Sequence, residues 1–198
     1  MDRLSALEAA VARQIQGKRL EHVYGVLESA RELSTRFGAP VAQAEVAALG
    51  HDYAKHMPAA ELLAAARSRR LIVDPTEEVQ PHLLHGAVAA ALLAEQGLVT
   101  APPVLDAIRW HTTGRAGMSV LERVIWLADY IEPHRDFPGV AEVRAAAQTD
   151  LDRALLMALD QTIRYVLVRG RRLHLYTVHA RNWLLAARTP GSPSIIEP

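Results

Sequence analysis

The segment RVIWLADYIEP, residues 123–133, decides the fold of this 198-residue chain. Apart from Asp129, residues 124–131 are apolar or aromatic. A helix that is apolar on every side belongs in the core of a globular protein. A lone carboxylate in such a helix is costly unless it is paired or binds a metal. The segment therefore predicts a central buried helix in which Asp129 has a cationic partner, either an arginine (Arg123 or Arg135) or a metal ion.

Helical periodicity extends outward from this segment over most of the chain. Apolar residues recur at intervals of three and four, as one face of a helix requires. Helices are expected at about 4–15, 20–37, 40–50, 58–67, 82–96, 102–111, 118–131, 149–168 and 175–187. Gly38 should end the second of these helices, and Asp150 and Thr177 are the expected N-caps of the last two.

Other kinds of structure have little support in the sequence. RLIVD, residues 70–74, is the only short β-branched run, and its Asp-Pro ending predicts a turn. No repeat or interior linker divides the chain. We therefore expect a single all-α domain over residues 1–188, followed by a Pro-, Gly- and Ser-rich tail, 189–198, that is flexible.

Composition and charge exclude several functional classes. The 22 basic residues balance 22 acidic ones, so nothing in the overall charge favours nucleic acid or a membrane surface as partner. The absence of cysteine excludes disulfides, thiolate metal sites and cysteine nucleophiles, and it fits a cytoplasmic location. The N-terminus lacks the features of a signal peptide, and no apolar run is long enough for a membrane span.

The chain has nine histidines, and those in apolar surroundings are the main clue to its function. In VAALGHDYAKH, residues 46–56, a His-Asp pair ends an apolar helix. Each histidine alone is more often structural than a ligand, and Asp52 alone could be a helix cap. The set that is hard to dismiss consists of His22, His51, Asp52, His85, His111 and Asp129. Imidazole and carboxylate without thiolate suit divalent iron, manganese, zinc, cobalt or nickel.

Six such ligands exceed the number that one catalytic ion with an open position would use. Two ions that share a bridging carboxylate fit the set better. Two divalent ions against two carboxylates would leave a local charge of about +2, which attracts phosphate and lowers the pKa of a bound water.

The chain resembles the bacterial HD-domain family that hydrolyses bis(5′-nucleosyl) tetraphosphates symmetrically. The resemblance rests on the His-Asp pair and on the blocks HTTGRAGMS, IWLADYIEPHRDFPGV, LDQTIRYVLVRGRRLH and ARNWLL. It implies a helical HD-domain bundle that holds a centre of two metal ions between its helices, with iron as the expected metal. It also implies that metal-activated hydroxide converts diadenosine tetraphosphate into two ADP. All six residues above would be ligands, with Asp52 bridging, and Asp52 and Lys55 would be catalytic. His134 departs from the family pattern and is expected to face solvent.

Five residues are candidates for binding substrate phosphate. Lys55 would lie on the same side as the His-Asp pair if the helix continues, and otherwise is a surface lysine. Thr112, Thr113 and Gly114 directly follow a ligand and could contact phosphate, or they could simply end the helix. Arg135 suits bidentate phosphate binding, with a surface salt bridge as the alternative.

The substrate class leaves alternatives open. Another HD phosphohydrolase, acting on a deoxynucleotide, a cyclic nucleotide or a nucleoside monophosphate, would use the same metal ligands. A non-catalytic metal- or nucleotide-binding regulator would be expected to lack some of them. The sequence identifies no base-reading residue, although Trp110 could border a base pocket, and it leaves the oligomeric state open, including a homodimer.

Overall fold

In the computed structural model, which describes residues 3–188, the protein is helical and contains no strand within that range. The helices are α1 (Arg3–Gln14), α2 (Lys18–Phe37), α3 (Val41–Gly50), α4 (Ala59–Ser68), α5 (Thr76–Val79), the 3-10 helix η1 (Pro81–Leu84), α6 (His85–Glu95), α7 (Pro102–Trp110), α8 (Val120–Ile131), α9 (Val140–Ala146), α10 (Leu151–Val168) and α11 (Leu175–Arg188). The predicted all-α fold is confirmed.

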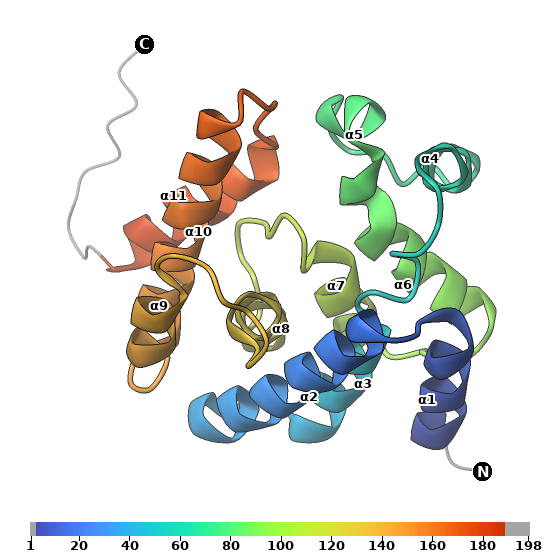
Figure 1. The fold of residues 1–198 in the computed structure, drawn as a ribbon, viewed down its shortest axis with the longest axis horizontal. Coiled ribbons are helices and arrows are strands. Elements are labelled where there is room, and N and C mark those ends of the chain that lie inside the picture. The colour runs from blue at the N-terminus through green and yellow to red at the C-terminus, as the bar shows by residue number, and fades with distance from the viewer. Residues whose placement is uncertain (1–2, 189–198) are drawn as a thin grey trace.

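Helix α8 is the centre of the bundle, as its apolar sequence predicts. Ser119 starts it with a capping box, in which its hydroxyl accepts from the Glu122 backbone N–H and the Glu122 carboxylate accepts from the Ser119 N–H. Figure 1 shows α8 end-on, with α2 and α3 on one side, α7 on another and the α10–α11 pair on the third. This position places both the apolar side chains of α8 and its one aspartate inside the molecule.

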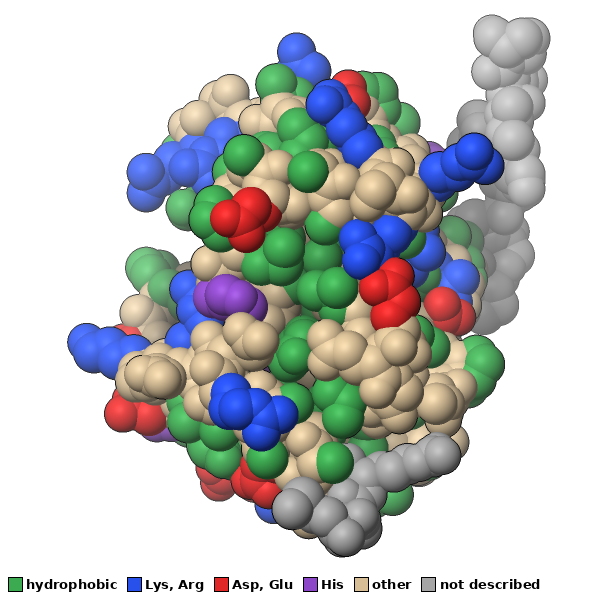
Figure 2. Space-filling view, turned by 90° about the vertical axis from the view of Figure 1, so that its right-hand side faces the viewer, with side chains coloured by type: hydrophobic (Ala, Val, Ile, Leu, Met, Phe, Trp, Pro, Cys, Tyr) green, Lys and Arg blue, Asp and Glu red, His purple; other side chains and the backbone are tan. Residues whose placement is uncertain are grey.

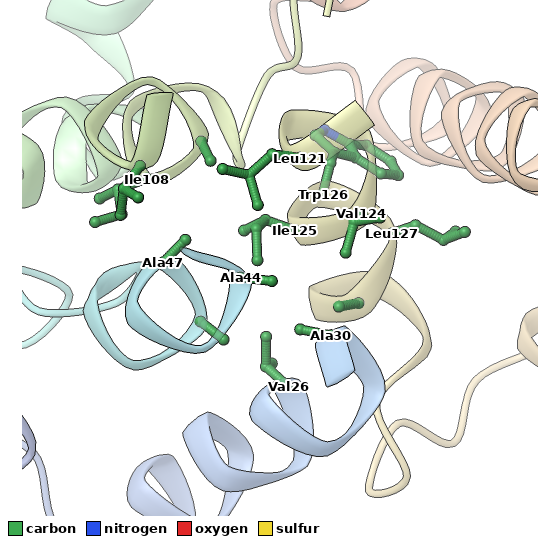
Figure 3. Close-up of a cluster of buried hydrophobic side chains, with 14 of the residues drawn as sticks. Val26, Ala30, Ala44, Ala47, Ile108, Leu121, Val124, Ile125, Trp126 and Leu127 are labelled. Carbon is green, nitrogen blue, oxygen red and sulfur yellow. The ribbon is translucent and has the colours of Figure 1, made fainter. Parts of the chain in front are cut away.

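The core is built from apolar faces that meet around α8 (Figure 3). Val26 of α2, Ala44 of α3 and Ile108 of α7 are buried on the surrounding helices. Ile125 of α8 points toward Ala44 and Ile108, Leu127 points to the opposite side of the helix, and both are fully buried (Figure 3). The alanines of α3 let neighbouring helices approach closely, which brings the ends of several helices to one place.

One local prediction is wrong. Thr177 is not an N-cap, because α11 begins at Leu175 and Thr177 is a buried residue of its first turn. Residues 70–74 form no strand, in agreement with the weak strand signal of this segment: Arg70 has a positive φ of 54°, and Leu71 and Ile72 pack as a loop against the core. Asp150 does cap α10, since its side chain accepts from the Arg153 N–H, and Gly38 ends α2 in the left-handed conformation.

The surface carries charges of both signs. Figure 2 shows basic and acidic side chains interspersed over the face on the right of Figure 1, which agrees with the zero formal net charge. Among residues 3–188, no helix combines the length and the apolar character that crossing a membrane requires.

Candidate metal centre

The fold brings all six predicted ligands to one place beside α8. His22 lies in the second turn of α2 and Asp129 in the last turn of α8. His51 and Asp52 directly follow the end of α3, His85 is the first residue of α6, and His111 directly follows α7. The ligands therefore come from the termini of four helices and from one turn of a fifth.

Close packing of α6 against α7 depends on Gly86, next to His85. A Cβ atom at this position would lie 2.8 Å from the Ile108 carbonyl oxygen and 3.0 Å from His111 Nδ1. The small residue after His85 therefore lets the start of α6 pack closely against the end of α7.

Three of the four imidazoles are oriented in the same way. The Nδ1 atoms of His51, His85 and His111 lie 2.7, 2.6 and 2.7 Å from the backbone carbonyl three residues earlier. A carbonyl oxygen only accepts, so each Nδ1 must carry the proton. Each Nε2 then presents a lone pair to the interior of the cluster.

His22 is oriented by a side chain instead. Its Nδ1 lies 3.1 Å from Oε1 of Glu132, and its Nε2 lies 3.2 Å from Asp129 Oδ1 and 3.3 Å from His51 Nε2. Burial acts to lower the pKa of His22, but hydrogen bonds to Asp129 and Glu132 outweigh it and raise the pKa.

The Asp52 carboxylate lies between two sets of histidines. Its Oδ1 is 3.1 Å from His85 Nε2 and 3.8 Å from His111 Nε2, while its Oδ2 is 3.9 Å from His22 Nε2. His85 and His111 are themselves only 2.9 Å apart between Nε2 atoms. One carboxylate thus faces a histidine pair with one oxygen and His22 with the other.

This arrangement of donors and acceptors calls for a cation. Converging imidazole lone pairs and carboxylate oxygens cannot hydrogen-bond to one another, and burying so many acceptors together is costly unless a cation lies among them. Arg135 at Asp129 and Lys55 at His85 supply positive charge from the partly exposed edge of the cluster. Two subsets have ligand atoms within 4.8 Å of one another: His22, His51 and Asp129, and His51, Asp52 and His111. Nitrogen and oxygen donors in this geometry fit a divalent metal.

The protonation states of four of the six predicted ligands also suit metal binding. Burial lowers the pKa of His51 and holds that of His111 well below its ordinary value, so both rings stay neutral. Burial acts to raise the pKa of Asp52 and Asp129, but the surrounding histidines and cationic side chains outweigh it and hold both pKa values below the ordinary one. Neutral imidazole and ionised carboxylate are the forms that bind metals.

Two cavities flank the cluster and share Lys55, Asp129 and Arg135 in their walls. The smaller, of about 190 Å³, continues past Thr112 to the aromatic side chains Trp126, Tyr130 and Phe137. The larger, of about 430 Å³, opens toward Lys18, Arg19 and His134. An elongated ligand could therefore lie across the cluster with one end in each cavity.

The predicted phosphate-binding residues fall into two groups. Lys55 reaches the cluster although α3 ends at Gly50 and the chain continues in turns: its Nζ lies 3.1 Å from His85 Nε2. Arg135 Nη2 lies 2.7 Å from Asp129 Oδ1, and Thr112 lines the smaller cavity. Thr113, in contrast, is buried and donates to the Gly114 carbonyl within the turn.

The structure adds residues that sequence reasoning did not assign to the site. Glu132 is buried against His22, and Arg19 Nη1 lies 3.5 Å from Asp52 Oδ2.

Two residues considered in the sequence analysis lie apart from the metal ligands. Trp110, considered there for a base pocket, does not line either cavity; it packs against Tyr176, with the guanidinium of Arg109 over its ring. His134 is 60% exposed, as expected, but its Nδ1 also lies 3.0 Å from Glu132.

Comparison with known proteins agrees with this geometry. Residues 19–134 match the family model described as HD domain. The symmetrical bis(5′-nucleosyl)-tetraphosphatase of Bacillus subtilis (strain 168) is 41% identical over 186 residues, which cover 94% of this chain and 99% of the relative. The enzyme of the same name from Halalkalibacterium halodurans is 40% identical over 93% of this chain and 98% of its own length.

A solved structure is similar over nearly the whole fold. It is the crystal structure of a "predicted HD superfamily hydrolase involved in NAD metabolism" from Clostridium acetobutylicum. It superposes with a TM-score of 0.88 at 36% identity and covers 93% of this chain and 97% of its own. At this level of similarity both the fold and the arrangement of helices around the cluster are shared.

Proposed function

The chain belongs to the HD-domain family and, within it, to the symmetrical bis(5′-nucleosyl)-tetraphosphatases, and on this premise we propose that it hydrolyses diadenosine tetraphosphate to two ADP. Water adds across the central anhydride: one inner phosphorus gains the water oxygen, the bond to the bridging oxygen breaks, and each half leaves as ADP. The observation that carries the proposal is the identity of about 40% to two such enzymes over nearly their whole length.

Two divalent ions, with iron as the first choice and manganese, cobalt, nickel or zinc as alternatives, fit the donor set. His22, His51 and Asp129 would hold one ion, and His85 and His111 the other. Asp52 would bridge them, because its two oxygens face different histidines. When bound, such ions supply Lewis-acid chemistry, which activates water and offsets phosphate charge.

Lys55 and Arg135 would bind the inner phosphates. Both line each of the two cavities, so they lie where the tetraphosphate would cross the cluster. Arg135 is held by Asp129, to which it donates from Nη2 at 2.7 Å and from Nε to the backbone carbonyl at 3.1 Å. A fixed guanidinium and a nearby ammonium stabilise charge that develops on phosphoryl oxygens.

The two halves of the substrate would occupy different surroundings. The smaller cavity, with Tyr130 and Phe137 in its wall, suits a nucleoside. The larger cavity, with Lys18 and Arg19 at its rim, suits the phosphates of the second half. Central cleavage follows if the phosphorus over the cluster is an inner one, with two phosphates on either side of the bond that breaks.

Product analysis tests the proposal. Protein loaded with Fe²⁺, Mn²⁺ or Co²⁺ should convert diadenosine tetraphosphate into two ADP, and Asp52→Ala should form no detectable ADP because both ions lose the shared ligand. Asp160→Ala, which removes an exposed aspartate that pairs with Arg181, is the matched control and should retain parent activity. ATP plus AMP as products, or no turnover with any of the three ions, would contradict the proposal.

A further inference from the structure

Glu132 is the carboxylate of the site that has no assigned role. It directly follows the end of α8, and its side chain is 2% exposed. A carboxylate is rarely buried without strong partners, because desolvation is costly. The partners of the Glu132 carboxylate therefore indicate its role in the site.

The two oxygens of Glu132 have separate partners. Oε1 lies 3.1 Å from His22 Nδ1. Oε2 accepts from the His134 backbone N–H at 2.7 Å and lies 3.0 Å from His134 Nδ1. The loop after α8 thus holds the carboxylate with one oxygen toward His22.

Space for this carboxylate comes from Gly25, one turn after His22 on α2. A Cβ atom at residue 25 would lie 2.5 Å from Glu132 Oε2, far inside contact distance. Helix α2 therefore presents a histidine and, one turn later, a gap into which the histidine's partner fits.

The contrast with the other three imidazoles points to a specific effect. His51, His85 and His111 donate from Nδ1 to neutral backbone carbonyls on their own segments. His22 donates to a carboxylate 110 residues away in the sequence. A carboxylate behind a metal-binding histidine fixes the ring orientation and increases the basicity of the ligand nitrogen.

We propose that Glu132 is a positioning residue that orients His22 toward the metal centre and strengthens the ion held by His22, His51 and Asp129. Glu132 borders the larger cavity, but both of its oxygens are engaged by His22 and His134, so we assign it a role through His22 and not as a ligand of the ion or the substrate. The inference rests on the metal centre of the proposed function, but not on the identity of the nucleotide.

Glu132→Gln is the informative variant, because it keeps the size of the side chain and removes the carboxylate. A glutamine side chain has only one acceptor oxygen. If that oxygen accepts from His22, the amide N–H₂ faces the His134 N–H, and if it accepts from the His134 N–H, the N–H₂ faces His22, so one contact is lost in either orientation. The expected result is a Kd for Mn²⁺ raised by about 10- to 100-fold at one of two sites, measured by isothermal titration of metal-free protein.

Glu122→Gln is the matched control. Glu122 lies in the first turn of α8, is 3% exposed, and accepts from the Ser119 N–H and from Arg115 Nε at 2.6 Å, away from the ligands. It should lower the unfolding midpoint of the metal-free protein while leaving both Mn²⁺ affinities at the parent value. Gly25→Ala, which displaces the Glu132 carboxylate without removing it, is the second variant and should weaken the same site.

The outcomes separate this inference from the proposed function. Parent-like Mn²⁺ affinity in Glu132→Gln and Gly25→Ala, or equal weakening in Glu122→Gln, would overturn the role of Glu132. Weaker Mn²⁺ binding in Glu132→Gln, in a parent that binds two ions but does not cleave diadenosine tetraphosphate, would support that role and overturn the substrate. A parent that binds no divalent ion would overturn both.

Discussion

At the scale of single residues, Lys55 is a partly exposed cation that lies against the pair formed by His85 and His111. Its Nζ lies 3.1 Å from His85 Nε2 and 3.7 Å from Asp52 Oδ1, and its side chain is 35% exposed. The ammonium therefore contacts the centre from the solvent side, where a phosphate would approach. It is close enough to interact with a ligand of the ions without being one itself.

Replacing Lys55 by methionine should lower kcat by about 10²- to 10³-fold, the usual cost of removing one group that stabilises transition-state charge. Mn²⁺ affinity should change little, because no metal ligand is removed. Steady-state kinetics with diadenosine tetraphosphate, beside a metal titration, measures both. His56→Ala, at an exposed position next along the chain, is the control. Unchanged kcat in Lys55→Met would assign this lysine to the surface.

The sequence points to the residues that converge in the cluster better than to the side chains that orient them. His51, Asp52 and Asp129 stand out because a polar or charged side chain in an apolar helix needs an explanation. Glu132 and Arg19 do not stand out, because a charged residue at a helix end is ordinary in sequence. Only the packing of α2 against the end of α8 shows that Glu132 is buried against His22.

At the scale of elements, Asp74 links the loop before α5 to the start of α11. Its Oδ1 accepts from the Thr76 N–H at 2.7 Å, and its Oδ2 accepts from the Leu175 N–H at 3.2 Å. Burial acts to raise the pKa of Asp74, but these hydrogen bonds outweigh it and lower the pKa. One side chain thus satisfies backbone donors of two helices that are distant in sequence.

Asp74→Ala should lower the free energy of unfolding at pH 7 by about 0.5–2 kcal/mol, the usual cost of losing a cap. Because the folded pKa lies below the unfolded one, this stabilisation is present above about pH 4 and is lost as the pH falls through the folded value. Urea denaturation at pH 7 and pH 3 should therefore show a smaller difference between variant and parent at pH 3. Asp160→Ala serves as the exposed control, and a difference that grows at low pH would contradict the assignment.

The same contact explains why Thr177 was wrongly predicted as the N-cap of α11, although the helix itself was predicted to begin near residue 175. Thr177 fits the local signature of an N-cap, but the actual start at Leu175 is stabilised by a carboxylate 101 residues earlier.

The sequence did not predict helices α5 and α9. Four and seven residues are too few for a periodic pattern, and α9 begins at the left-handed Gly139. Long helices with a continuous apolar face, such as α8 and α10, were predicted to within two residues at each end.

At the scale of the whole molecule, the proposed metal centre joins helices that otherwise meet mainly through apolar packing. Its predicted ligands come from α2, the turn after α3, α6, the turn after α7, and α8, which together span His22 to Asp129. Helices α10 and α11 cover α8 on another side and supply no ligand. Bound ions should therefore stabilise the folded chain as a whole, since the unfolded chain does not keep the ligands together.

Removing the ions should lower the unfolding temperature. An ion present at a hundredfold excess over its Kd contributes about 2.7 kcal/mol, which for a domain of this size corresponds to about 5–11 °C per site. Differential scanning calorimetry of the Mn²⁺-loaded protein, before and after exhaustive chelation, measures the shift. Asp52→Ala is the comparison: without the shared carboxylate its melting curve should hardly respond to chelator. If the parent melts at the same temperature with and without ions, the buried cluster holds no metal that stabilises the fold, and its imidazole lone pairs must be satisfied in another way.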